Sequence, residues 1–222
     1  MGVLPGVGGP VGGAKKVIPI QASFLTSFSA GSSAGETNYT SPSINFGADA
    51  PNRKLLVGVF RQGSVNVNSM TLAGNAMTLL YAPPSSLVGF HWYILSHPSG
   101  ASGVLNNVMS TNTARGFGVW RLIGAGALYD SADAGNAGPN PSVAVNVKKG
   151  GALFAGARAN SAGTALGSSW TGVTHSFGVG PIGTGNTRGA AGMYLGGPES
   201  GRTVSLATSL DARLSAISLE PE

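Results

Sequence analysis

The stretch Arg53–Tyr81, RKLLVGVFRQGSVNVNSMTLAGNAMTLLY, predicts a strand, a loop and a hairpin in succession. From Leu55 to Phe60 both alternating faces are apolar, which is typical of a strand in the middle of a packed sheet. Gly74-Asn75 separates two β-prone runs, Met70–Leu72 and Ala76–Leu80, and glycine reaches the positive φ that a tight hairpin turn requires. We therefore expect an antiparallel β protein.

Working outward from this stretch, β-prone runs separated by turn residues continue along the chain. We expect strands at Val17–Ala30, Ser43–Phe46, Val88–Ser96, Val104–Ser110, Gly116–Ile123, Ser142–Lys148, Ala152–Ala159, Thr171–Phe177, Met193–Leu195, Thr203–Thr208 and Arg213–Leu219. Two segments rich in Gly, Asn or Pro, Asp130–Pro141 and Gly178–Gly189, are expected to be loops. No convincing helix pattern and no exact internal repeat is present, and turn signals recur roughly every 8 to 15 residues. The pattern predicts an all-β, antiparallel β-sandwich of jelly-roll-like type.

The length of 222 residues suits one large β-sandwich or two small domains. We expect a single sandwich domain over residues 17–222, preceded by an extended arm over residues 1–16. The chain has no Cys, so disulfides, thiolate metal sites and thiol nucleophiles are excluded, and stability must come from packing, pairing or assembly.

Charged residues make up 9% of the chain, compared with about 25% in ordinary globular domains. A chain this poor in charge either has a bland surface of Gly, Ser, Thr and Asn or covers much of its surface with partners, and we favour partners. The formal net charge is +5, but the 13 Lys and Arg are scattered rather than clustered with aromatic residues. We therefore expect no specific nucleic-acid binding. No apolar run is long enough for a transmembrane helix, so we expect no membrane insertion.

Residues 1–16, MGVLPGVGGPVGGAKK, form a Gly/Pro-rich segment with neither a helix nor a strand period. The simple alternative is a disordered tail. We expect instead an extended arm that a neighbouring chain or subunit holds in place, as an assembly anchor. The candidate anchor residues are Val3, Leu4, Pro5, Val7, Pro10, Val11, Lys15 and Lys16.

Two short motifs resemble known catalytic or nucleotide-binding patterns but lack their context. Gly31–Gly35 matches the G-x-S-x-G elbow of hydrolases, which needs a helix after the serine, and a polar loop follows here. Gly178–Gly183 matches G-x-G-x-x-G, which must open a helix to hold a pyrophosphate, and Pro181 opposes that. We expect no enzyme activity and no cofactor.

The titratable residues give no clear site either. His91, His97 and His175 have no second ligand at a regular offset, so we interpret them as packing or surface residues. Most of the eight carboxylates lie in expected turns, where they bond the local backbone. Asp130 and Asp133 leave a calcium loop open as an alternative, without the EF-hand pattern. A facing carboxylate pair, as in a glycosidase, also stays open.

Trp170 is the candidate glycan contact. Trp92 and Trp120 lie within expected strands and are more typical of core residues, whereas Trp170 borders a Gly/Ser loop. A tryptophan at such a border can stack on a sugar ring.

Several segments resemble a β-sandwich module of bacteriophage virion and tail proteins that also occurs in some secreted bacterial proteins. They are the strand with its approach at Asp49–Val59, the hairpin at Asn68–Thr78, the aromatic strand with its turn at His91–Gly100, and the strand Gly118–Gly124. The resemblance covers about residues 40–220 and includes no catalytic residue. It implies a jelly-roll-like sandwich and a role in a virion particle or as a surface-binding module.

From these observations we expect a non-enzymatic structural protein of a phage or phage-like particle, exposed on the head or tail and anchored by its N-terminal arm. Its expected partners are other virion proteins and copies of itself, in a symmetric assembly such as a trimer. The alternative is a carbohydrate-binding module that attaches to a host surface glycan. A depolymerase is a third alternative, which would need two facing carboxylates in a cleft.

Overall fold

The computed structural model of the chain describes residues 16–30, 36–63, 65–84, 90–96, 98–160, 166, 169–182 and 187–222. These residues form nineteen strands and no helix. All the strand pairings within this part of the chain are antiparallel. The expected all-β, antiparallel fold is confirmed.

The strands divide at Gly124 into an N-terminal half and a C-terminal half. The N-terminal half contains β1 (Gln21–Ala30), β2 (Asn38–Thr40), β3 (Ile44–Asn45), β4 (Arg53–Arg61), β5 (Val67–Leu72), β6 (Asn75–Ala76), β7 (Thr78–Tyr81), β8 (His91–Ser96), β9 (Ser102–Gly103), β10 (Leu105–Met109) and β11 (Arg115–Ile123). The C-terminal half contains β12 (Ala125–Gly138), β13 (Ser142–Val147), β14 (Gly151–Asn160), β15 (Trp170–Thr171), β16 (Thr174–Ile182), β17 (Thr187–Gly196), β18 (Glu199–Leu206) and β19 (Ala212–Pro221).

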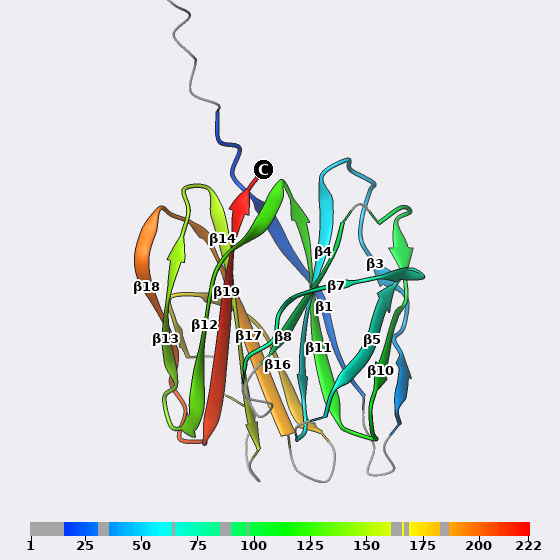
Figure 1. Cartoon of the computed structure of the whole chain (residues 1–222), viewed down its shortest axis with the longest axis vertical. Coiled ribbons are helices and arrows are strands. Elements are labelled where there is room, and N and C mark those ends of the chain that lie inside the picture. Colours follow the sequence, from blue (N-terminus) through cyan, green and yellow to red (C-terminus); the bar gives the residue numbers. More distant parts are fainter. Residues whose placement is uncertain are drawn as a thin grey trace, which may run out of the picture.

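Both halves wind their strands in the same order. The N-terminal half has an inner sheet β1-β11-β4-β8-β7 and an outer sheet β2-β10-β5-β6, and the C-terminal half has an inner sheet β12-β19-β14-β17-β16 and an outer sheet β13-β18-β15. Leaving aside the two-residue strands β3, β6 and β9, the first strand of each half pairs with the last, the second with the seventh, and the third with the sixth. This is jelly-roll winding, and the chain contains it twice. Figure 1 shows the two halves side by side.

The four sheets enclose three apolar cores. An outer core fills each half between its own two sheets, with Val57 and Leu72 in the N-terminal half and Val145 and Leu214 in the C-terminal half. The central core lies between the two inner sheets and takes side chains from both halves. The central inner strand β4 is therefore buried on both faces, whereas the outer strand β13 alternates exposed and buried residues.

In the central core, aromatic side chains of the N-terminal half pack against Gly156 and Gly189 of the opposite inner sheet, beside larger residues such as Phe154. Phe90, Trp92 and Trp120 from the N-terminal half are fully buried there. Phe90 lies directly against Gly156 of β14, where an added Cβ would lie 2.3 Å from the ring. The two halves consequently fit together with little room for any side chain at Gly156.

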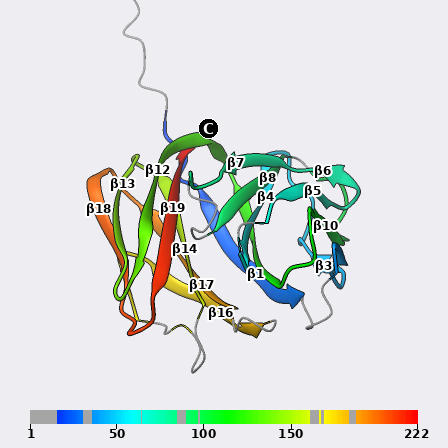
Figure 2. The same cartoon turned by 60° about the horizontal axis from the view of Figure 1, so that its bottom comes forward.

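Polar contacts align the two halves across this core. The Ser215 hydroxyl of β19 donates a hydrogen bond to the Phe90 carbonyl and accepts one from the Phe90 N–H, both at 3.0 Å. On one side of the interface Tyr81 of β7 donates to Asp133 of β12 at 2.7 Å, and on the other Phe24 stacks on Phe177. The turned view in Figure 2 shows the two inner sheets facing each other.

The first strand of the stretch Arg53–Tyr81 occupies the expected place in the middle of a sheet. Strand β4 lies in the middle of its sheet, and Leu55 to Arg61 are all buried. The predicted hairpin is present over residues 70–77, with its turn one residue earlier than expected, whereas residues 78–81 form β7 and pair with β8 in the inner sheet. Ala73 and Gly74 have positive φ values of 51° and 78°, and Leu72 pairs with Asn75. Positive φ at both central residues is typical of a primed hairpin turn.

Two loop predictions are wrong, because long-range pairing overrides local composition. Most of the expected loop Asp130–Pro141 belongs to β12, which pairs with β19 through several bulges. Much of the expected loop Gly178–Gly189 belongs to β16 and β17, and Ile182 is buried in the central core. Each of these strands gains a neighbouring strand that the local sequence does not reveal.

The boundary of one domain over residues 17–222 stays a prediction. Each half has its own outer core, but both halves contribute to the central core. The described residues include no helix long and apolar enough to cross a membrane.

Candidate functional site

The first and last described residues lie at the same end of the molecule (Figure 1). The Ile20 N–H donates to the Gly150 carbonyl at 2.8 Å, and the Glu222 N–H donates to the Gly124 carbonyl at 3.0 Å. Gly150 has a φ of 73°, and an added Cβ would lie 3.1 Å from the Cα of Pro19. Glycine at this position thus lets the incoming chain lie flat against the β13–β14 turn.

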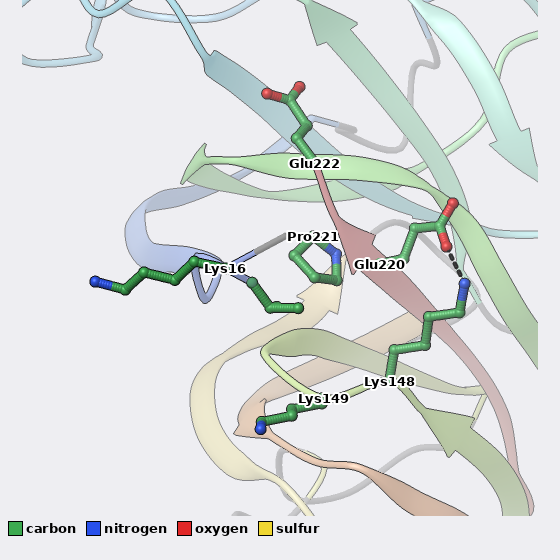
Figure 3. Close-up of a pocket in the computed structure, with 7 residues that line it drawn as sticks. Lys16, Lys148, Lys149, Glu220, Pro221 and Glu222 are labelled. Carbon is green, nitrogen blue, oxygen red and sulfur yellow. Dashed lines mark hydrogen bonds and ion pairs between the residues drawn. The ribbon is translucent and has the colours of Figure 1, made fainter. Parts of the chain in front are cut away.

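A pocket of about 480 Å³ lies between the first and the last described residues. Its lining consists of Lys16, Val17, Lys148, Lys149, Glu220, Pro221 and Glu222. Figure 3 shows that these residues come from three segments, namely the start of the described chain, the β13–β14 turn and the end of β19. We call this cavity the arm-end pocket.

The carboxylates of the arm-end pocket are paired with lysines. Lys148 forms an ion pair with Glu220, and this hydrogen bond raises the pKa of the Lys148 amine. Lys54 lies 2.9 Å from Glu222. Within the described part of the chain, Lys16 and Lys149 have no ion-pair partner, and in the view of Figure 3 both extend away from the carboxylates. The pocket lining therefore has three lysines and two glutamates, an excess of one positive charge, and Lys16 and Lys149 are the two lysines without an ion-pair partner among the described residues.

Exposed apolar side chains gather around the same end. Val17 and Ile18 are 44% and 64% exposed, although the sequence placed them inside the first strand, which begins at Gln21. Leu195 is 42% exposed and lies opposite Ala152 at the start of β14. Tyr129 is 43% exposed and lies beneath Lys148, whose amine is 4.7 Å from the ring centre. A fifth large apolar side chain, Leu79, is exposed on edge strand β7, away from the arm-end pocket.

A shallow groove of about 440 Å³ adjoins the pocket through Lys148 and Lys149 and includes Tyr129, Asn146 and Ser200. Asn146 donates to Asp130 at 2.9 Å, and its amide oxygen accepts from the Gly201 N–H at 2.9 Å. The amide is thus already bonded within the protein, and the Tyr129 ring is the aromatic surface of the groove.

Trp170, the predicted glycan contact, is half-buried in β15. It packs against the C-terminal outer core, and its indole N–H donates to His175 Nδ1 at 3.2 Å. Burial lowers the pKa of His175, which keeps this nitrogen available as an acceptor at neutral pH. Trp170 lies in the outer sheet and does not line the arm-end pocket. Whether it contacts a glycan stays a prediction.

Most of the predicted anchor residues cannot be placed. Val3, Leu4, Pro5, Val7, Pro10, Val11 and Lys15 lie outside the described residues. Lys16 is described, is exposed and lines the arm-end pocket. The sequence thus indicated one residue of this pocket, but not the β13–β14 turn or the end of β19 that complete it.

The short motifs do not form a nucleotide-binding helix. Gly31–Gly35 and the last glycine of the 178–183 motif lie outside the described residues. Gly178–Ile182 is part of strand β16, so the motif opens no helix there. Among the described residues, no group of three or more His, Asp or Glu side chains is arranged to hold a metal ion.

The titratable residues are distributed over several separate contacts. Asp130 bonds Asn146 and Asp133 bonds Tyr81, so the two carboxylates of the proposed calcium loop have different partners. His91 lies in the N-terminal outer core with its Nε2 2.6 Å from the Arg61 guanidinium, and His97 is outside the described residues. Burial and, to a lesser degree, Arg61 lower the pKa of His91 to about 4.

Buried arginines are the feature that the sequence analysis missed. Arg53 is fully buried and donates hydrogen bonds to the carbonyls of Gly47, Ala48, Pro98 and Gly100. Arg115, also fully buried, donates to the carbonyls of Glu36 and Thr113. These guanidiniums hold irregular segments against the sheets, and their position directly before apolar strand patterns was the available signal.

Comparisons with known proteins give little further information. No protein-family model matches the chain, and no curated protein matches it either. Among solved structures, the C-terminal domain of the Streptococcus pyogenes antigen I/II-family protein AspA aligns over 93% of this chain and 92% of that chain, with 8% identity and a TM-score of 0.20. A similarity this low carries no argument about fold or function.

Proposed function

We propose that this chain is a non-enzymatic structural protein of a phage or phage-like particle, displayed on the head or tail and attached through its N-terminal arm. The observation that carries the proposal is the gathering of exposed apolar side chains, Val17, Ile18, Tyr129 and Leu195, at the end where the arm begins. Apolar side chains concentrated at one end of a protein are typical of a surface that a partner covers.

The architecture supports the same proposal at the level of analogy. Jelly rolls occur in viral capsid proteins and in lectins, and this chain contains two such units in series. The partners in this proposal are other virion proteins and copies of the chain itself. The low content of charged residues agrees with a surface that is partly covered in an assembly.

The decisive experiment compares the full chain with a variant that lacks residues 1–16. Both proteins are purified, their folding is checked by circular dichroism, and their co-sedimentation with particles from the source culture is measured. We expect the truncated protein to fold but to lose co-sedimentation. If the truncated protein co-sediments as well as the full chain, or if the full chain does not join any particle, the proposal is wrong.

A pair of point variants distinguishes binding through the exposed side chains beside the arm-end pocket from non-specific adsorption. Ile18→Ser removes an apolar side chain beside the arm-end pocket, and Leu79→Ser removes one of comparable exposure on β7. We expect Ile18→Ser to weaken particle binding and Leu79→Ser to leave it unchanged. Equal effects of the two variants would indicate non-specific adsorption.

A carbohydrate-binding function is the second candidate, favoured by the shallow groove in which the exposed Tyr129 lies beside Asn146 and Ser200. An exposed aromatic ring can stack on a sugar, and this stacking carries the candidate, because the Asn146 amide and the Ser200 hydroxyl already form hydrogen bonds within the protein. A glycan array would test this function, with Tyr129→Ala and Trp170→Ala measured separately. Binding lost in only one variant identifies the contact, and a silent array with the intact protein removes this candidate.

A further inference from the structure

The arm-end pocket combines unbalanced positive charge with an apolar lining. Lys16 and Lys149 lie on its rim without an ion-pair partner among the described residues, while Lys148 and Lys54 are paired with Glu220 and Glu222. Val17 and Pro221 supply apolar surface between these charges. A ligand that fits both properties carries negative charge and an apolar group a few ångströms apart.

We propose that the arm-end pocket binds an extended segment of a partner protein in which carboxylate and apolar side chains alternate. This inference rests on the proposed function, because it names the chemistry of the partner at the attachment end. Side chains of an extended segment that are two residues apart lie on the same face, so one face can present carboxylates to Lys16 and Lys149. The residue between them then points the other way, toward the exposed side chains of Val17 and Ile18.

A second copy of this chain fits the pocket less well than an acidic partner. The copy would have to supply carboxylates, but Glu220 and Glu222 are already held by Lys148 and Lys54. Asp49 and Glu199 likewise have arginine partners, and Asp130 and Asp133 accept hydrogen bonds from Asn146 and Tyr81. Only Glu36 and Asp211 have neither an ion pair nor such a hydrogen bond among the described residues, and they are far apart in the sequence, so one short segment of a second copy cannot present two free carboxylates. Charge complementarity therefore favours a different protein with free acidic residues.

The test uses defined peptides and the full chain. The probe is a blocked peptide of alternating Glu and Leu, five residues long, compared with one analogue that carries Gln for Glu and one that carries Ser for Leu. Binding is followed by NMR through the signals of Val17, Lys149 and Leu195. We expect saturable shifts at these residues with the Glu/Leu peptide and at least about tenfold weaker binding of either analogue.

Variants of the two lysines provide the matched control. The double variant Lys16→Glu, Lys149→Glu should bind the Glu/Leu peptide at least about tenfold more weakly, whereas Lys16→Arg, Lys149→Arg should bind it nearly as well as the natural chain. Raising the salt concentration should weaken binding to the natural chain but not the residual binding of the Glu double variant.

Several outcomes would overturn the inference. Equal binding of the Glu and Gln peptides would exclude carboxylate recognition, and shifts confined to other surfaces would exclude the pocket. Tighter binding of a short oligonucleotide at the same residues would indicate a nucleic-acid partner instead. Peptide binding without any effect of arm deletion on particle association would leave the pocket assignment standing while the proposed function failed.

Discussion

The two halves of the molecule have the same strand order but contribute different side chains where they meet. The N-terminal half supplies four fully buried aromatic residues to the central core, whereas the C-terminal half supplies a mixture of small residues and larger ones such as Phe154, Ile217 and Leu219. The contributing aromatic residues are Phe60, Phe90, Trp92 and Trp120, and the small ones are Ala152, Gly156, Gly189 and Ala191. The same jelly-roll strand order can therefore occur twice in one chain without a repeated sequence, provided that the facing surfaces remain complementary.

Strand pairing allows individual positions of the two halves to be matched. Gly58 of β4 and Gly156 of β14 occupy the third strand of their halves, and an added Cβ at either would collide with the Phe90 ring. Aligning the halves on these glycines matches Trp92, opposite Gly58, with Ala191, opposite Gly156. At this position a bulky side chain in one half corresponds to a small one in the other, whereas the aligned residues Leu56 and Phe154 are both large and both buried in the central core.

The largest expected effect comes from the position at which the halves differ most. Trp92→Ala removes a fully buried indole and should lower the free energy of unfolding by about 3–5 kcal/mol, with Trp92→Phe intermediate. The corresponding change in the other half, Ala191→Gly, should cost only about 1 kcal/mol. Urea unfolding followed by circular dichroism measures both. Equal costs would show that the aromatic face does not dominate the central core.

A smaller effect is expected at Arg53, the first residue of β4. Arg53→Met should cost about 2–4 kcal/mol, because it leaves four buried or partly buried carbonyls without their donor. The aligned position in the C-terminal half is Gly151, which supplies no such anchor. Hydrogen exchange should accelerate first around Gly47 and Gly100. Unchanged exchange in these segments would contradict the assigned role of Arg53.

Adding a methyl group to the small-residue face tests the fit of the halves directly. Gly156→Ala should cost about 1–3 kcal/mol, since the Phe90 ring must move. Gly138→Ala in β12 is the matched control, because an added Cβ there meets nothing within 4 Å, and it should change stability by less than about 0.5 kcal/mol. Combining Gly156→Ala with Phe90→Leu should give less than the sum of the two costs. Strict additivity would mean that the two residues do not compete for the same space.

Acid sensitivity should distinguish the halves by the smallest amount. Position 91, aligned with Ala190, holds a histidine whose pKa is lowered to about 4, so it stays neutral in the folded protein. Below pH 6.5 the His91 imidazole binds a proton in the unfolded chain, whereas in the folded chain it stays neutral down to about pH 4. Stability should therefore fall as the pH drops through this window, by on the order of 2 kcal/mol.

The control for this prediction is His91→Gln, which cannot titrate. Burial also lowers the pKa of His175, so the natural chain and the variant share that contribution and their difference isolates His91. Unfolding measured at pH 7 and pH 4.5 should show a smaller loss in the variant. The same loss in both proteins would assign the acid sensitivity to other groups.

Local patterns predicted most of the strands because burial on one or both faces leaves a clear mark. The alternation of Val143, Val145 and Val147 and the apolar run Leu55–Phe60 both occupy the cores that their patterns indicate. Segments with many glycines were harder, since glycine in β16 serves close strand packing as readily as a turn. Of the arm-end pocket, only Lys16 was predicted. Apart from the neighbouring Val17, the other lining residues come from the β13–β14 turn and the end of β19, far away in the sequence.

The sequence by itself determined the all-β class, the central place of β4, the hairpin at residues 70–77 and the burial of Trp92 and Trp120. These follow from side-chain period and turn chemistry, which act over a few residues. Only the tertiary structure decided that the winding occurs twice, that Phe90 packs against Gly156, and that Lys16 and Glu222 line one pocket. Such features depend on which distant surfaces are complementary, and complementarity is a property of the packed pair rather than of either segment alone.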